Sequence, residues 1–176
     1  MIALLTISLQ AEKIGILTKN DRVFTIKVDG KDFNITRDMT PCAKNKGWLQ
    51  ALVPLKGVTP ATELDVLDAL KNKSATLVDM RMGEDFYEAT IPNAISIPFN
   101  MIPAELGQLG CSYDKKWDCS KGVKVIVFCN GPVCPQSPIG MQSMVKNGYP
   151  VENIMYYRGG MLDWSALGFT TVQGKF

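Results

Sequence analysis

The pattern of apolar and polar residues changes near residue 58 of this 176-residue chain. After it, short apolar runs typical of buried strands alternate with stretches in which apolar residues recur at helical spacing. Strands are predicted over 75–79, 94–97, 123–128 and 154–157, and helices from Thr59-Pro60, Glu84, Ser137-Pro138 and Met161. Apolar strands separated by helices predict an α/β fold with a mainly parallel sheet.

The first of these helices is expected to begin at Thr59-Pro60. Threonine is a good helix cap, and proline is favoured at the first helical position. Leu64, Leu67 and Leu70 would then form the apolar stripe of this helix.

The residues before 58 have a different pattern. Two runs rich in β-branched and aromatic residues, at 23–28 and 33–36, flank Asp29-Gly30, which predicts a β-hairpin. Residues 38–57 contain scattered prolines and glycines and read as an irregular linker. We therefore expect a β-rich leader and linker over 12–57 and the main domain over 58–176.

Residues 1–11 resemble a secretory signal. The apolar run Ile2 to Leu9 is too short to span a bilayer but similar to a signal core, with cleavage expected after Ala11. This interpretation predicts a periplasmic or otherwise exported protein. The alternative is an ordinary first strand in a cytoplasmic protein.

Composition narrows the function classes. Hydrophobic residues make up 46% of the chain, which is enough for a packed core, and the net charge is +2. The lysines are scattered without a basic stripe, so nucleic acid is not an expected partner. Histidine is absent, which excludes Ser-His and Cys-His catalytic pairs and histidine metal sites.

Five cysteines are the main candidates for chemistry: Cys42, Cys111, Cys119, Cys129 and Cys134. The spacing contains no Cys-x-x-Cys pair, so we expect neither a metal site nor a cofactor. Cys111 and Cys119 flank a polar loop and are expected to form a disulfide if the protein is exported. In the cytosol they would remain thiols.

Cys129 and Cys134 lie in the stretch CNGPVCPQSP, directly after the most apolar predicted strand and before a helix. Ligand sites of open α/β sheets gather at the carboxyl ends of strands. The N–H groups and the dipole of the helix N-terminus favour a thiolate there. The sequence therefore indicates a loop that holds a reactive thiol rather than a stiff turn with incidental sulfur.

Three segments together resemble a known family. They are LVDMRMGEDFYEATIPNAISIPF (77–99), VIVFCNGP (125–132) and YYRGGMLDW (156–164), and their order and spacing resemble single-domain rhodaneses, a sulfurtransferase family. The CNGPxC loop with a β-rich leader also resembles a bacterial exported subgroup. The resemblance implies a five-stranded, mainly parallel sheet flanked by helices and a cysteine nucleophile at Cys129 that carries sulfur as a persulfide.

The resemblance also implies roles for neighbouring residues. Asp79 and Arg81 match the family's Asp-x-Arg pair and are expected to be structural. Cys134 is expected to resolve a persulfide or to form a disulfide with Cys129. The loop holds no lysine or arginine, so substrate binding is expected from its other residues and one arginine: Asn130, Gly131, Val133, Gln136, Ser137 and Arg158.

These residues predict transfer of sulfane sulfur from a persulfide, polysulfide or thiosulfate to a thiophilic acceptor, which can be a protein thiol. Two other functions stay open: a dithiol redox protein that uses Cys129 and Cys134, and a non-catalytic module that binds or senses sulfur. A cysteine phosphatase would need arginine six residues after the cysteine, where this chain has Pro135.

Overall fold

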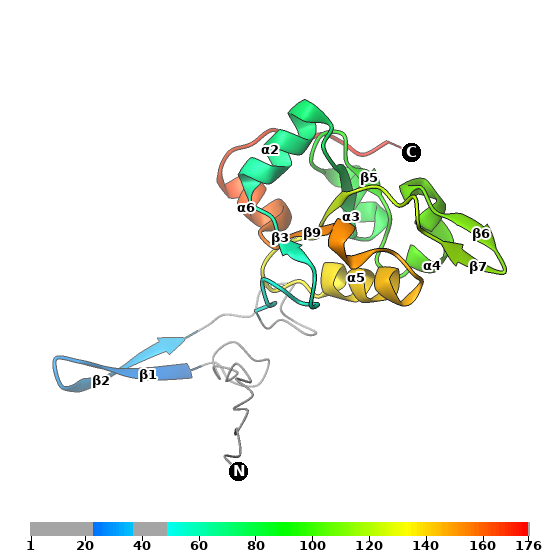
Figure 1. Ribbon diagram of the computed structural model, residues 1–176. Coiled ribbons are helices and arrows are strands. Elements are labelled where there is room, and N and C mark those ends of the chain that lie inside the picture. The colour runs from blue at the N-terminus through cyan, green and yellow to red at the C-terminus, as the bar shows by residue number, and fades with distance from the viewer. Residues whose placement is uncertain (1–22, 37–48, 176) are drawn as a thin grey trace, which may run out of the picture. The chain divides into compact units, whose positions relative to one another are not determined.

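The computed structural model describes residues 23–36 and 49–175 (Figure 1). The chain divides into two compact units, Met1–Trp48 and Leu49–Phe176. The signal-like residues 1–11 and Cys42 lie outside the described residues, so the interpretation of that segment stays a prediction.

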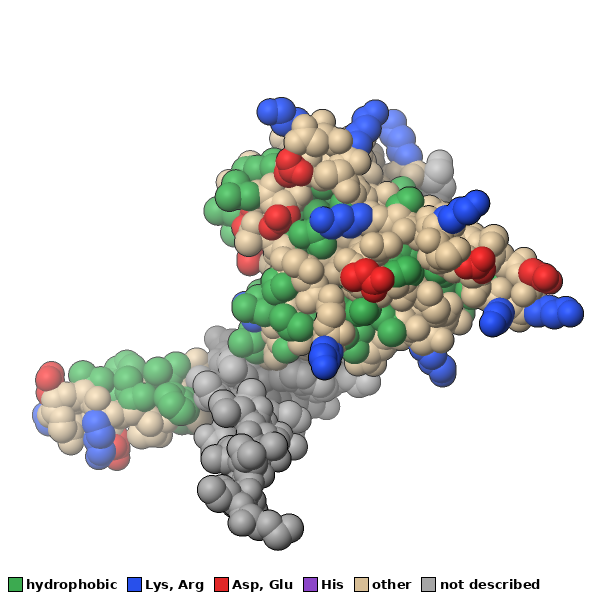
Figure 2. All heavy atoms as spheres, viewed as in Figure 1, with side chains coloured by type: hydrophobic (Ala, Val, Ile, Leu, Met, Phe, Trp, Pro, Cys, Tyr) green, Lys and Arg blue, Asp and Glu red, His purple; other side chains and the backbone are tan. Residues whose placement is uncertain are grey.

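The first unit contains the predicted hairpin. Strands β1 (Val23–Val28) and β2 (Lys31–Thr36) pair antiparallel, with Val28 opposite Lys31. Asp29 and Gly30 both have positive φ, at 51° and 76°, which is the geometry that a two-residue hairpin turn requires. Hydrophobic side chains remain exposed along this hairpin, as Figure 2 shows: Val23, Phe24, Val28, Phe33 and Ile35.

The second unit is built on a five-stranded parallel sheet, as predicted. Its strands lie in the order β3-β9-β8-β4-β5. They are β3 (Thr59–Pro60), β4 (Thr76–Asp79), β5 (Ile95–Ser96), β8 (Val125–Phe128) and β9 (Ile154–Tyr157). The helices are α2 (Glu63–Asn72), α3 (Gly83–Glu88), α4 (Ile102–Glu105), α5 (Gln136–Lys146) and α6 (Gly160–Ala166), with 3-10 turns η2 (Leu106–Leu109) and η3 (Val151–Asn153).

Alternation along the strands divides the core into two layers. Val127 and Tyr156 face a cluster that includes Met141 and Met144 of α5. Phe128 and Tyr157 face the opposite cluster, which includes buried residues of α2 and α6. Because successive strand residues point to opposite faces, the apolar side chains of β8 and β9 contribute to both layers.

The prediction for the first helix was wrong. Thr59-Pro60 forms the edge strand β3 and pairs with Met155 and Tyr156, while α2 begins only at Glu63. The N–H of the capping residue Thr62 donates to the Asp65 carboxylate at 2.8 Å. Leu64, which was expected in the apolar stripe, is 76% exposed, and the buried residues of α2 are Val66 and Ala69.

The polar segment between Cys111 and Cys119 is a second, short hairpin that the sequence did not predict. Strands β6 (Ser112–Asp114) and β7 (Lys116–Asp118) pair antiparallel. A disulfide joins Cys111 and Cys119, whose Cα atoms are 4.2 Å apart. The disulfide is the state expected for an exported protein.

Among the helices of the described ranges, none has the length and apolar character needed to cross a bilayer.

Candidate active site

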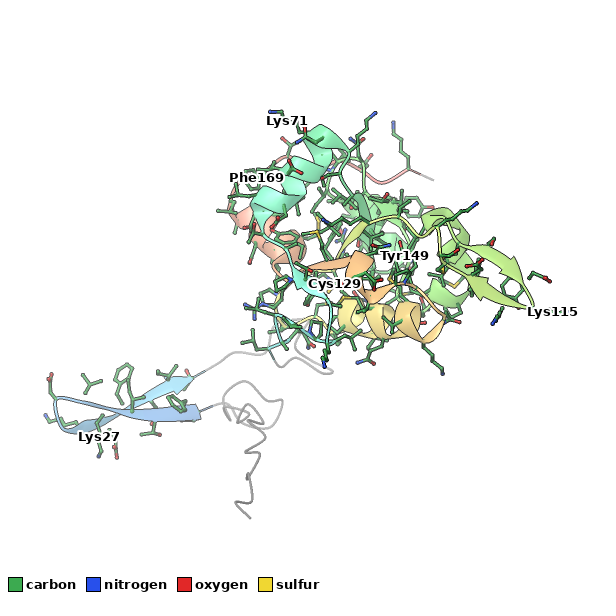
Figure 3. All side chains as sticks on the ribbon, viewed as in Figure 1. Lys27, Lys71, Lys115, Cys129, Tyr149 and Phe169 are labelled. Carbon is green, nitrogen blue, oxygen red and sulfur yellow. A yellow bond between two sulfur atoms is a disulfide. The ribbon has the colours of Figure 1, made fainter. Side chains whose placement is uncertain are left out.

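The CNGPVCPQSP stretch lies where the sequence predicted it, between β8 and α5 (Figure 3). Cys129 directly follows Phe128, the last residue of the most buried strand. Neither loop cysteine takes part in a disulfide, and both are buried, with 1% of Cys129 and 3% of Cys134 exposed.

The start of α6 holds the beginning of this loop. The N–H groups of Met161 and Leu162 donate to the carbonyl oxygens of Cys129 and Asn130 at 3.0 and 2.9 Å. Gly160 makes this approach possible, since its φ is 57° and a Cβ there would lie 2.9 Å from the nitrogen of Gly131. With its carbonyl groups bound to α6, this part of the loop can present N–H groups to the sulfur.

Neighbouring polar groups act on the pKa of the Cys129 thiol. Burial raises the pKa of this thiol, but the Cys134 side chain, the Ser137 side chain and the N–H groups of Ser137 and Gly131 lower it. The pKa of Cys129 consequently lies below that of an ordinary cysteine. The Ser137 hydroxyl makes no hydrogen bond of ordinary geometry with a described residue, so its proton can turn towards a thiolate.

The second thiol lies beside the first. The Cys129 thiol donates to the carbonyl oxygen of Cys134 at 3.6 Å, and the Cys134 thiol donates to Gln136 Oε1 at 3.3 Å. A turn closed by the Cys134 N–H and the Gly131 carbonyl, at 2.9 Å, folds Cys134 back towards Cys129. This arrangement suits exchange of a sulfur atom or of a disulfide bond between the two residues.

Asp79 and Arg81 form a buried ion pair at the end of β4. The Arg81 side chain donates from Nη2 to Asp79 Oδ2 at 2.7 Å and from Nε to Oδ1 at 3.0 Å. Thr90 Oγ1 donates to the same carboxylate at 2.8 Å, and Arg81 Nη1 reaches Asn130 Oδ1 at 3.5 Å. The structure brings the pair together next to the loop, and its structural role stays a prediction.

Arg158 is less available for a substrate than the sequence suggested. Its Nη1 donates to the carbonyl oxygen of Gln50 at 3.1 Å. The N–H of Gln50 in turn donates to the carbonyl oxygen of Pro132 in the loop at 2.8 Å. Gln50 is 7% exposed and was missed by the sequence analysis, because nothing in the irregular linker distinguishes it.

Tyr156 is a second residue that the sequence analysis missed. Its hydroxyl is buried and has no hydrogen-bond partner among the described residues. Burial raises the pKa of this phenol above its usual value, and negative charge on Cys129 or Cys134 raises it further, while Arg158 lowers it. The apolar run of β9 gave no sign that this tyrosine approaches the thiols.

The remaining predicted residues lie in or beside the loop. Gly131 packs closely on α6, where a Cβ would lie 2.9 Å from Leu162 Cδ1. Val133 is partly buried, and Gln136 opens α5. The loop therefore gathers one thiol of lowered pKa, a second thiol and backbone donors at the carboxyl end of the sheet.

The fold and the site together define an α/β domain with a buried cysteine of lowered pKa in the loop after β8. Residues 62–167, more than half of the chain, match the rhodanese-like domain family. The chain belongs to this family.

Known proteins extend the comparison. An HTH-type transcriptional regulator from Mycobacterium tuberculosis is 26% identical over 113 residues, which cover 64% of this chain and 44% of the regulator. The chain thus spans less than half the length of that curated relative.

Two solved structures share the fold. A thiosulfate sulfurtransferase from Pseudomonas aeruginosa is 24% identical with a TM-score of 0.51, over 67% of this chain and 21% of that one. The BH2092 protein from Bacillus halodurans is 22% identical with a TM-score of 0.52, over 65% of this chain and 76% of that one.

Proposed function

We propose that this protein is a sulfurtransferase that carries sulfane sulfur on Cys129 as a persulfide. The observation that carries the proposal is the set of donors that lowers the pKa of Cys129 although the thiol is buried. A thiolate is the nucleophile in sulfur chemistry, so a site that lowers the pKa of its thiol is suited to attack sulfane sulfur. Membership of the rhodanese-like family supports the same reaction.

The reaction proceeds in two steps. The Cys129 thiolate attacks the terminal sulfur of the donor, a new S–S bond forms, and the old S–S bond breaks with its electron pair on the leaving sulfur. An acceptor thiolate, or cyanide in an assay, then attacks the outer sulfur, and the electron pair of the Cys129 S–S bond returns to Cys129. The Gly131 and Ser137 N–H groups stabilise the Cys129 thiolate at the beginning and the end of this cycle.

The charges around the loop favour particular donors. The stretch from Cys129 to Pro138 contains no lysine or arginine, and Arg158 already binds the Gln50 carbonyl. Thiosulfate carries two negative charges and is best bound by a free cation. We therefore infer that a persulfide or polysulfide is a better donor than thiosulfate for this site.

The burial of Cys129 means that the loop must open for a substrate to enter. The hydrogen bond from Gln50 to Pro132 is one contact that holds the loop closed. Only 1% of the Cys129 side chain is exposed in the closed arrangement.

Intact-protein mass after incubation with polysulfide tests the proposal. The wild-type protein and Cys134→Ser should gain the mass of one sulfur atom and lose it to cyanide, and Cys129→Ser should gain none. The rate of Cys129 alkylation should rise with pH through a midpoint below that of an ordinary cysteine thiol, because the neighbouring polar groups lower the pKa of Cys129. Sulfur loading by Cys129→Ser but not by Cys134→Ser would refute the assignment.

A dithiol redox protein is the second candidate, and the contact between the Cys129 thiol and Cys134 favours it. In this function the two thiols would cycle through a disulfide without carrying extra sulfur. A measured reduction potential in the range of known oxidoreductases, with no sulfur loading, would support this reading instead. A module that only binds or senses sulfur would show neither property.

We also propose that the protein is exported, and the Cys111–Cys119 disulfide supports this. Protein from native cells should then begin near Glu12. N-terminal sequencing that finds Met1 in a cytosolic fraction would contradict export.

A further inference from the structure

The Tyr156 hydroxyl is a polar group in the core without an evident structural purpose. A buried hydroxyl without a partner costs free energy, and such groups usually pair. Tyr156 is 1% exposed, and its oxygen finds no partner among the described residues. Phenylalanine would fill the same space without that cost, so the hydroxyl calls for an explanation.

The register of the sheet places Tyr156 on the side of the sulfur. In the parallel pair of β8 and β9, Tyr156 lies opposite Val127, and both side chains face the layer that contains α5. Cys129 comes directly after β8, two residues beyond Val127, so it lies at the end of the strand with which β9 pairs. The charges that act on the phenol are those of Cys129, Cys134 and Arg158, which supports a place for the hydroxyl near the two thiols.

The resting thiol already has its own donors. The groups that lower the pKa of Cys129 are the Cys134 and Ser137 side chains and the N–H groups of Ser137 and Gly131. The phenol of Tyr156 is not among these groups. A persulfide extends the side chain by one sulfur atom, and the negative charge moves from the Cys129 sulfur to that outer atom.

We propose that the Tyr156 hydroxyl donates a hydrogen bond to the outer sulfur of the Cys129 persulfide. Among the described residues the hydroxyl has no partner in the resting protein, and it gains a hydrogen-bond acceptor when sulfur is loaded. This inference rests on the proposed function and adds a residue of β9 to a site otherwise built from the loop and the start of α5.

Phenols can serve this role only when they keep their proton. The raised pKa of Tyr156 ensures this, since burial and the neighbouring thiols all disfavour the phenolate. The residue therefore acts as a donor over the whole pH range in which the persulfide is an anion.

The test compares Tyr156→Phe with Tyr157→Phe in the full chain. Tyr157 is the next residue of the same strand, faces the opposite layer and donates to Glu63 Oε1 at 2.9 Å. Tyr157→Phe therefore measures the general effect of removing a tyrosine hydroxyl at this end of the sheet. Polysulfide is the probe. The pKa of the loaded persulfide and of the unloaded thiol are each measured from the pH dependence of alkylation by iodoacetamide.

Tyr156→Phe should raise the pKa of the persulfide by about one unit, because the anion loses a hydrogen bond. At alkaline pH the equilibrium constant for sulfur loading should fall about tenfold for the same reason. The pKa of the unloaded thiol should stay unchanged. Tyr157→Phe should alter neither pKa.

Two outcomes overturn the inference. One is an unchanged persulfide pKa in Tyr156→Phe, and the other is an equal shift of the loaded and unloaded values, which would indicate a general disturbance of the loop. Both leave the proposed function standing, because sulfur still loads on Cys129. If the wild-type protein itself loads no sulfur, the proposed function fails, and this inference fails with it.

Discussion

Replacing Asp79 by asparagine should strongly destabilise the domain. Asp79 is fully buried, and its carboxylate accepts hydrogen bonds from the Arg81 side chain, the Arg81 backbone N–H and Thr90 Oγ1. Asparagine keeps the volume but removes the charge, and the Arg81 side chain, 6% exposed, keeps an uncompensated positive charge. Breaking a buried ion pair in this way costs about 3–5 kcal/mol.

The loss of stability in Asp79→Asn can be measured by urea unfolding at pH 7 and by thermal melting. For a domain of this size, a loss of about 3–5 kcal/mol lowers the melting temperature by roughly 10–20 °C. Thr90→Val removes one hydrogen bond from the same carboxylate and should cost only about 1.5–3 kcal/mol.

A second replacement separates the charge from the packing. Adding Arg81→Met to Asp79→Asn removes the stranded charge and should restore part of the lost stability. If the pair is structural, as the sequence predicts, the folded fraction of Asp79→Asn should still load sulfur. The reasoning is refuted if Asp79→Asn lowers the free energy of unfolding by less than about 1 kcal/mol. It is also refuted if the double variant loses as much stability as the two single variants added together.

Three further predictions concern the loop and the disulfide. Gly160→Ala should slow sulfur loading on Cys129 by at least tenfold, because the added Cβ collides with the loop backbone; an unchanged loading rate in a stopped-flow assay would contradict this. Gln50→Pro removes the N–H that binds the loop and should speed alkylation of Cys129, whereas Gln50→Gly keeps that N–H and should have the smaller effect; equal rates in the two variants would be the contrary result. Serine at both Cys111 and Cys119 should lower the free energy of unfolding by roughly 2–3 kcal/mol, as expected for a short closed loop, and a loss below about 0.5 kcal/mol in urea titration would show that the hairpin needs no covalent closure.

The sheet could be predicted because its strands have strong local signals. The runs that became β4, β8 and β9 are apolar on both faces, and Asp29-Gly30 has the turn chemistry of a hairpin. The predicted helix start at Thr59-Pro60 was wrong for the opposite reason. A two-residue edge strand has no periodicity in the sequence, and its pairing with β9 is a long-range contact.

The pattern of residues alone predicted the part of the site that neighbours in sequence form, and the family resemblance added Asp79, Arg81 and Arg158. Cys129, Cys134 and Ser137 belong to one stretch, so their proximity follows from the turn between β8 and α5. Gln50 and Tyr156 come to the loop from distant parts of the chain. Neither residue differs in its local pattern from an ordinary linker or core position, so only the fold reveals them.

The disulfide and the two loop thiols set a redox constraint on this domain. Cys119 precedes β8 and Cys129 follows it, so the nine residues between them include the whole of β8, a strand of four residues that spans about 13 Å. Thiol–disulfide exchange needs direct contact between sulfur atoms, and a rigid strand in the middle of the sheet keeps the two pairs out of reach of each other. The strand thus acts as a spacer that lets a sulfur-carrying thiol and a structural disulfide coexist in one small domain without scrambling.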